Sequence, residues 1–176
     1  KNSPTLSSLT GQTSGFTSAT LSYDGTKMYV HWDGPGSDNK TYQINLSTPW
    51  DTASASLEGY ISDPTDEFWT GFTLNKEGTK VYSRPAGTSS IQYRNLSTAN
   101  DLRTKSAVIF NVTLPQAAYA AGHFIDEDET LILIADRSNS TAGKIHKYLF
   151  NTPGDLAGGL TFNSTITIQT LPNYTG

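Results

Sequence analysis

The sequence contains no cysteine, which excludes disulfide bonds, thiol catalysis and cysteine-based metal centres. Charged residues are scarce, at 16% of 176 residues, and lysine and arginine form no cluster. Together with a net charge of −4, this argues against a nucleic-acid-binding surface. The longest purely apolar run covers residues 131–135, far short of the roughly 20 residues that cross a bilayer, so no membrane insertion is expected.

What the sequence does contain is an internal repeat. A first motif, Thr-Leu-Ser-Tyr-Asp-Gly-Thr-Lys-Met-Tyr-Val in its first copy, occupies residues 20–30, 73–83 and 124–134. Its acidic anchor residue recurs after 53 and then 51 residues. The third copy is degenerate, because Glu129 stands where the other two copies have the glycine of an Asp-Gly or Glu-Gly turn.

A second motif follows the first in every unit. It covers residues 42–51, 92–101 and 147–155, and its last aspartate recurs after 50 and then 54 residues. Two motifs that keep one period near fifty indicate a repeat architecture, for which a β-propeller is the leading option.

Each unit is predicted to form four strands, because short alternating segments are separated by turn residues. Asp24-Gly25 between the first two segments is a strong hairpin signal, since glycine supplies the positive φ that the turn needs. Gly25 and its counterpart Gly78 are therefore expected at positive φ. In the first unit the four strands are expected near residues 15–22, 27–32, 41–46 and 56–62.

The predicted fold class is all-β, with three tandem four-stranded propeller-blade-like repeats plus one extra N-terminal strand. Residues 1–13 are assigned to that strand because residues 7–13 resemble the outer strand of the first unit. The alanine-rich residues 117–121 are interpreted as a link between units rather than a helix. Because the chain opens on lysine, it is expected to be processed or excised from a longer repeat array. The three repeats are assigned to residues 14–67, 68–118 and 119–176.

The first unit carries Asp-Gly-Thr-Lys-Met-Tyr-Val followed by Tyr-Gln-x-x-Leu-Ser-Thr-Pro-Trp-Asp. This pair of motifs resembles the propeller-type tandem repeat of bacterial surface and phage tail proteins. The resemblance is close in the first unit, partial in the second and weak in the third. It implies an extracellular, non-enzymatic interaction module at a cell or virion surface, and it transfers no catalytic residue.

No arrangement of residues predicts a catalytic, cofactor or metal site. His31, His123 and His146 occur at different places in the repeat, and no spacing suggests a nucleophile–histidine–carboxylate triad. Residues 126–129 form an acidic run that could attract calcium, but the run coincides with the hairpin turn of the other units and lacks the spacing of a calcium loop. A solvated turn is favoured. The Ser-x-Asp-x-Gly-x-x-Trp pattern of sialidase propellers is absent as well.

Two surface chemistries stay open. The side chains of Trp32, Trp50 and Trp69 could stack on sugars, although packing between repeats is favoured. Seven of eleven asparagines begin an Asn-x-Ser/Thr sequon, where chance gives about three, and these would carry N-glycans in a eukaryotic secretory route. The candidate glycosylation sites are Asn39, Asn45, Asn95, Asn111, Asn139, Asn163 and Asn173.

Three blades cannot close a ring, because closed propellers need four or more. The open ends predict a self-associating extracellular structural module, whose partners are copies of itself joined head-to-tail into a multimer, fibre or appendage, with strand donation from residues 6–13. The alternative is a receptor- or glycan-binding module of a phage tail or cell-surface adhesin. An enzyme ranks third, since no convergent acid–base constellation is visible.

Overall fold

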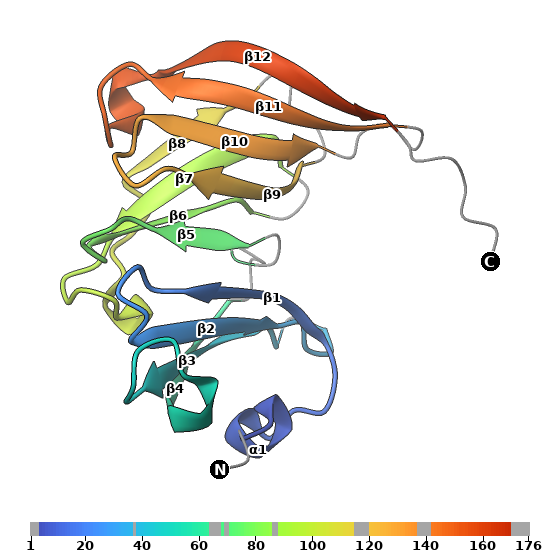
Figure 1. Ribbon diagram of the computed structural model, residues 1–176, viewed down its shortest axis with the longest axis vertical. Coiled ribbons are helices and arrows are strands. Elements are labelled where there is room, and N and C mark those ends of the chain that lie inside the picture. The colour runs from blue at the N-terminus through green and yellow to red at the C-terminus, as the bar shows by residue number, and fades with distance from the viewer. Residues whose placement is uncertain are drawn as a thin grey trace.

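The computed structural model describes residues 4–36, 38–63, 68, 71–85, 88–114, 120–136 and 142–169. These residues form three four-stranded antiparallel sheets, each a simple meander in which consecutive strands are hydrogen-bonded neighbours. We call the sheets blades 1, 2 and 3; Figure 1 shows them stacked one on the next along the long axis of the molecule. The predicted all-β class with three blade-like repeats is confirmed.

The strands follow the two repeated motifs, and a single-turn 3₁₀ helix, capped by the last aspartate of the second motif, precedes the outer strand of each blade. Blade 1 consists of β1 (Phe16–Leu21), β2 (Lys27–Trp32), β3 (Lys40–Leu46), η1 (Thr52–Ser54) and β4 (Ala55–Ser62). Blade 2 consists of β5 (Phe72–Leu74), β6 (Lys80–Ser83), β7 (Ser90–Asn95), η2 (Leu102–Thr104) and β8 (Phe110–Thr113). Blade 3 consists of β9 (Ala120–Ile125), β10 (Leu131–Asp136), β11 (Ala142–Phe150), η3 (Leu156–Gly158) and β12 (Leu160–Gln169).

The hairpin turn is the same in all three blades. Gly25 and Gly78 have φ values of 70° and 66°, which confirms the prediction for both. Glu129, at the equivalent position of blade 3, also takes a positive φ of 52°, so the turn survives the loss of its glycine. A residue of the second motif contacts each turn through a backbone hydrogen bond. The N–H groups of Trp50, Asn100 and Gly154 donate to the carbonyls of Gly25, Gly78 and Glu129, respectively.

The blades pack face to face through two apolar layers and a repeated hydroxyl contact. Tyr29, Phe72 and Val81 belong to the layer between blades 1 and 2, and Tyr82 and Ile132 to the layer between blades 2 and 3. The Tyr29 hydroxyl donates to the carbonyl of Asn100 in blade 2, and the Tyr82 hydroxyl reaches the equivalent carbonyl of Gly154 in blade 3. The first strands of successive blades also touch, since Thr20 Oγ1 donates to the Phe72 carbonyl over 2.9 Å. β1, β5 and β9 are therefore the inner strands.

The N-terminal segment is a helix, not the predicted strand. α1 (Leu6–Thr10) starts at Thr5, whose side chain accepts the N–H of Ser8, and it ends at Gly11 with a φ of 76°. A threonine N-cap and a glycine C-cap at this spacing stabilise a single helical turn. The spacing of three also places Leu6 and Leu9 on one helix face, where they pack against the apolar layer of blade 1 that faces away from blade 2.

Because α1 covers that face, we expect Leu9→Ala to lower the free energy of unfolding by about 1–2 kcal/mol, less than a fully buried leucine would. Urea titration monitored by circular dichroism measures this. Leu57→Ala is the matched control, because Leu57 is an exposed leucine on β4 of the same blade and should change stability little. Equal effects of the two substitutions would show that the helix does not stabilise the blade.

In the described part of the chain, no helix is long and apolar enough to cross a membrane.

Candidate functional site at the inner strands

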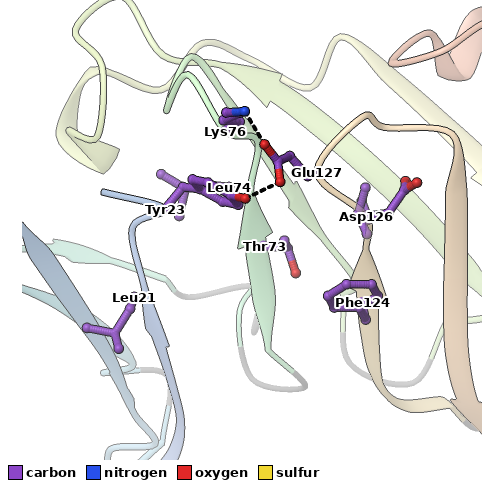
Figure 2. Close-up of a pocket in the computed structure, with 9 residues that line it drawn as sticks. Leu21, Tyr23, Thr73, Leu74, Lys76, Phe124, Asp126 and Glu127 are labelled. Atoms are coloured by element: carbon purple, nitrogen blue, oxygen red, sulfur yellow. Dashed lines mark hydrogen bonds and ion pairs between the residues drawn. The ribbon is translucent and has the colours of Figure 1, made fainter. Parts of the chain in front are cut away.

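A pocket of about 320 Å³ opens between the inner strands, where the hairpin turns of the three blades come together. Side chains from all three blades line it, as Figure 2 shows. Tyr23 comes from blade 1, Lys76 from blade 2, and Phe124 and Glu127 from blade 3. The pocket thus exists only because three units of the repeat stand side by side.

Three of these side chains occupy one and the same repeat position. Tyr23, Lys76 and Glu127 are each the fourth residue of the first motif, two residues after the end of the inner strand. The Glu127 carboxylate accepts hydrogen bonds from both the Tyr23 hydroxyl and the Lys76 ammonium group, which Figure 2 marks as dashed lines. The ammonium group also lies 5.6 Å from the centre of the Tyr23 ring. The structure therefore joins a phenol, an amine and a carboxylate from three blades in one network.

The network sets the protonation state of its members. The hydrogen bond from Lys76 lowers the pKa of Glu127, and the hydrogen bond to Glu127 raises the pKa of Tyr23 and that of Lys76. Near neutral pH the site accordingly holds one carboxylate, one ammonium group and one phenol hydroxyl. It offers a proton acceptor and two proton donors within a few ångströms of each other.

The rest of the pocket lining is mostly apolar. Phe124 on β9 is 55% exposed and Leu21 at the end of β1 is 43% exposed, and both line the pocket. Asp126 has a structural role, because its Oδ1 accepts the N–H groups of Thr130 and Leu131 at 2.7 and 2.8 Å and so holds the turn. The pocket therefore combines a flat apolar surface with polar groups at one end, which suits a small ring-shaped molecule.

Residues 126–129 form the predicted turn. Glu127 also lines the pocket, and this role was not predicted from the sequence. The signal was present in the alignment of the three units. At the fourth position of the first motif the residue changes from tyrosine to lysine to glutamate, so each unit has a different functional group there. Residues that differ in type at one repeat position, next to the axis shared by the inner strands, are candidates for a joint site.

The three histidines do not come together at this pocket. His31 lies buried in blade 1 beside Thr41 and Asp63, and His146 lies buried in blade 3 beside Asp136. His123 sits on β9, facing the region of Arg84 between blades 2 and 3. Within the described ranges, no three histidine, aspartate or glutamate side chains are grouped so that they could hold a metal ion.

The candidate glycosylation sites differ in accessibility. Asn39 is 3% exposed and its Oδ1 accepts the N–H of Gly34 over 2.9 Å, so its amide is not open to a glycan in the folded chain. Asn45 is half-buried and receives a hydrogen bond from Lys27. Asn95, Asn111 and Asn163 are exposed, and Asn139 and Asn173 lie outside the described residues. Glycosylation at the exposed sites stays a prediction.

The tryptophans also differ in their exposure to solvent. Trp32 is buried and its indole N–H donates to the Ser14 carbonyl over 2.7 Å, which agrees with the packing interpretation. Trp50 is 60% exposed and covers Gly25. Trp69 lies outside the described residues.

No protein-family model matches the chain, and no curated protein matches it. Solved structures do. A protein from Lactobacillus plantarum aligns with 88% of this chain at a TM-score of 0.56 and 13% identity, over 42% of its own length. A protein from Bacteroides fragilis, described as a putative 6-phosphogluconolactonase, aligns with 88% of this chain at a TM-score of 0.54 and 12% identity, over 40% of its own length.

A third similar structure, from Bacteroides uniformis, has the same description and aligns with 86% of this chain at a TM-score of 0.52 and 14% identity, over 40% of its length. The chain thus spans about two fifths of each of these proteins. At such low identities the similarity establishes the fold, which is that of consecutive propeller blades.

These similarities contradict the predicted function. Two of the proteins that share the fold are described as putative 6-phosphogluconolactonases, and none of the three descriptions names a structural, tail or adhesion protein. The prediction of a non-enzymatic extracellular module that self-associates, with a receptor- or glycan-binding alternative, is therefore wrong. The expectation that the chain is no enzyme also loses its support. Residues 6–10, part of the segment expected to donate a strand, form a helix that packs against blade 1.

Proposed function

We propose that the pocket between the inner strands binds a small sugar lactone and that its polar network promotes hydrolysis of the lactone to the open acid. The observation that carries this proposal is the convergence of Tyr23, Lys76 and Glu127 from one repeat position into a connected set of proton donors and an acceptor. The description of two proteins of the same fold as putative 6-phosphogluconolactonases supports the choice of substrate class.

The chemistry needs a base and a group that stabilises negative charge. The Glu127 carboxylate accepts a proton from a water molecule, and that water adds to the lactone carbonyl carbon. The Lys76 ammonium group and the Tyr23 hydroxyl donate to the carbonyl oxygen while it carries the negative charge of the tetrahedral intermediate. The ring C–O bond then breaks, and the proton held by Glu127 passes to the departing ring oxygen.

The apolar wall orients the ring. One face of a pyranose lactone carries mainly C–H groups, and the exposed ring of Phe124 offers a flat surface against which that face packs. The hydroxyl-bearing edge of the sugar then lies toward the polar end of the pocket.

Removing the base is the direct test. We expect Glu127→Gln to lower the rate of enzymatic δ-lactone hydrolysis by about 100-fold or more, because general-base assistance is worth that much. Tyr23→Phe should lower the rate by about 100-fold, since it removes one of two donors to the oxyanion. Acid release in a pH-stat, with spontaneous hydrolysis subtracted, measures these rates for gluconolactone and its 6-phosphate.

The chain offers a matched control. Lys27 and Glu58 form an ion pair of 2.5 Å within blade 1, and neither residue lines the pocket. Glu58→Gln should leave the hydrolysis rate unchanged. Acid release no faster than in buffer, or equal rates for Glu127→Gln and the unaltered protein, would rule the proposal out.

A further inference from the structure

A second polar cluster lies on blade 3, away from the pocket lining. Asp136 on β10, His146 on β11 and Thr165 on β12 occupy three neighbouring strands of the sheet. Asp136 Oδ2 lies 3.2 Å from His146 Nε2, and Thr165 Oγ1 lies 2.8 Å from His146 Nδ1. A carboxylate and a hydroxyl therefore contact opposite nitrogens of one imidazole ring.

Burial differs along this row. Asp136 is 4% exposed and His146 is 3% exposed, whereas Thr165 is exposed on the outer strand. A carboxylate beside Nε2 places the ring proton on that nitrogen, so Nδ1 keeps its lone pair and accepts the Thr165 hydroxyl proton. The order carboxylate, imidazole and hydroxyl is the arrangement by which hydrolases activate an alcohol nucleophile.

Blade 1 contains the same three residue types in an arrangement that lacks this order. Thr41 Oγ1 and Asp63 Oδ2 lie 3.0 and 3.7 Å from the same nitrogen, Nδ1 of His31. Thr41 is also buried, so no reagent reaches its hydroxyl. In blade 3, by contrast, the carboxylate and the hydroxyl contact different nitrogens of the ring, and the hydroxyl-bearing residue is exposed.

A register shift supplies the surface next to Thr165. The pairing of β11 with β12 shifts between Lys147 and Tyr148, so that Tyr148 pairs with Phe162 while His146 pairs with Thr165. Phe162 and Thr165 consequently lie on the same face of the sheet although they are three positions apart along the strand. The Phe162 ring centre lies 6.3 Å from that of His146, and the residue is partly exposed, which leaves an apolar surface beside the hydroxyl.

We propose that Thr165 is an acyl-acceptor nucleophile, activated by His146 and Asp136, for esters with a small apolar acyl group. Thr165 Oγ1 attacks the ester carbonyl while its proton moves to His146 Nδ1. The bond between the carbonyl carbon and the leaving oxygen breaks, and the same proton passes to that oxygen, which leaves as an alcohol or phenol. The product is a threonine ester on β12, and Asp136 holds the ring and balances the transient imidazolium charge.

This site is independent of the lactone pocket, and its test uses a different reagent and readout. We treat the full chain with p-nitrophenyl acetate and follow intact mass, p-nitrophenol release and peptide mapping. The expected result is one acetyl group per chain, located on Thr165, formed about 100-fold faster than any acetylation of Thr165→Val. Thr165→Ser should keep the reaction, and Asp136→Asn and His146→Asn should slow it.

The matched control is Thr167→Val, because Thr167 is an exposed threonine of the same strand that pairs with Lys144 rather than a histidine. It should acetylate like the unaltered protein. If His146→Asn does not fold, as judged by its circular dichroism, the comparison of Thr165→Val with Thr165→Ser still decides. Acetyl groups spread over lysines, or equal labelling of Thr165→Val, would overturn the proposal.

Discussion

Replacing Gly78 with alanine is expected to lower the free energy of unfolding by about 3 kcal/mol. The residue has a φ of 66°, which costs a residue with a Cβ about 1 kcal/mol or more. An added Cβ would lie 2.0 Å from Asn100 Oδ1 and 2.9 Å from the Asn100 backbone nitrogen. The backbone atom cannot move aside without breaking its hydrogen bond to the Gly78 carbonyl, so overpacking adds to the strain. Urea-induced unfolding followed by far-UV circular dichroism measures the loss.

Gly25 provides the comparison within the same chain. An added Cβ there would lie 2.3 Å from the ring of Trp50, but that side chain is 60% exposed and can swing away. We therefore expect Gly25→Ala to lower stability less than Gly78→Ala, by about 2 kcal/mol. If both substitutions left stability unchanged, the turn geometry assigned to the first motif would be wrong.

Blade 3 shows how the fold tolerates a side chain at this position. Glu129 replaces the glycine, and the residue that closes its turn is Gly154, where blades 1 and 2 have Trp50 and Asn100. One of the two facing positions is glycine in every blade, and both have positive φ. Asn100→Gly should therefore recover part of the stability that Gly78→Ala loses, and a double-mutant cycle measures the coupling.

The glycine lies in the first motif in blades 1 and 2 and in the second motif in blade 3. This difference shows which parts of the fold the sequence could predict. The period, the strands and the Gly25 and Gly78 turns follow from local signals, namely alternation and a residue that tolerates positive φ. The third turn could not be judged from Glu129 alone, because its geometry depends on Gly154, which follows only 25 residues later in the second motif. Local patterns predict the elements, while compatibility between facing positions is a property of the assembled blade.

The wrongly predicted N-terminal strand and the missed candidate site have the same origin. Residues 7–13 resemble the outer strand of the first unit, but Leu6 and Leu9 find a buried apolar face only when α1 forms, and tertiary packing decides between the two structures. The candidate site was missed because Tyr23, Lys76 and Glu127 are far apart along the chain and meet only when inner strands stand side by side. A search for carboxylates or histidines at fixed spacing does not detect such a site.

The second large expected effect is a loss of stability at acidic pH caused by His123. Both ring nitrogens of His123 are shielded from solvent, and this burial, together with the nearby Arg84 charge, lowers the pKa of His123 to about 4. In the unfolded chain a histidine titrates near pH 6.5. Between these values the unfolded chain binds a proton that the folded chain does not, so stability decreases as the pH falls from about 6.5 to about 4. We expect a loss of about 2–3 kcal/mol over this window, since each pKa unit of difference corresponds to about 1.4 kcal/mol.

The variant His123→Gln separates this histidine from the other ionisable groups. Its absolute stability will differ because the packing changes, so the quantity to compare is the slope of unfolding free energy against pH. Carboxylates such as Asp126 and Glu127 have pKa values below their ordinary range in the folded chain, and their contribution is lost mainly below the histidine window. The unaltered protein should therefore lose stability between pH 6.5 and 4.5 more steeply than His123→Gln. Parallel slopes over that interval would mean that His123 can take up a proton in the folded protein as easily as in the unfolded chain, which contradicts its burial beside Arg84.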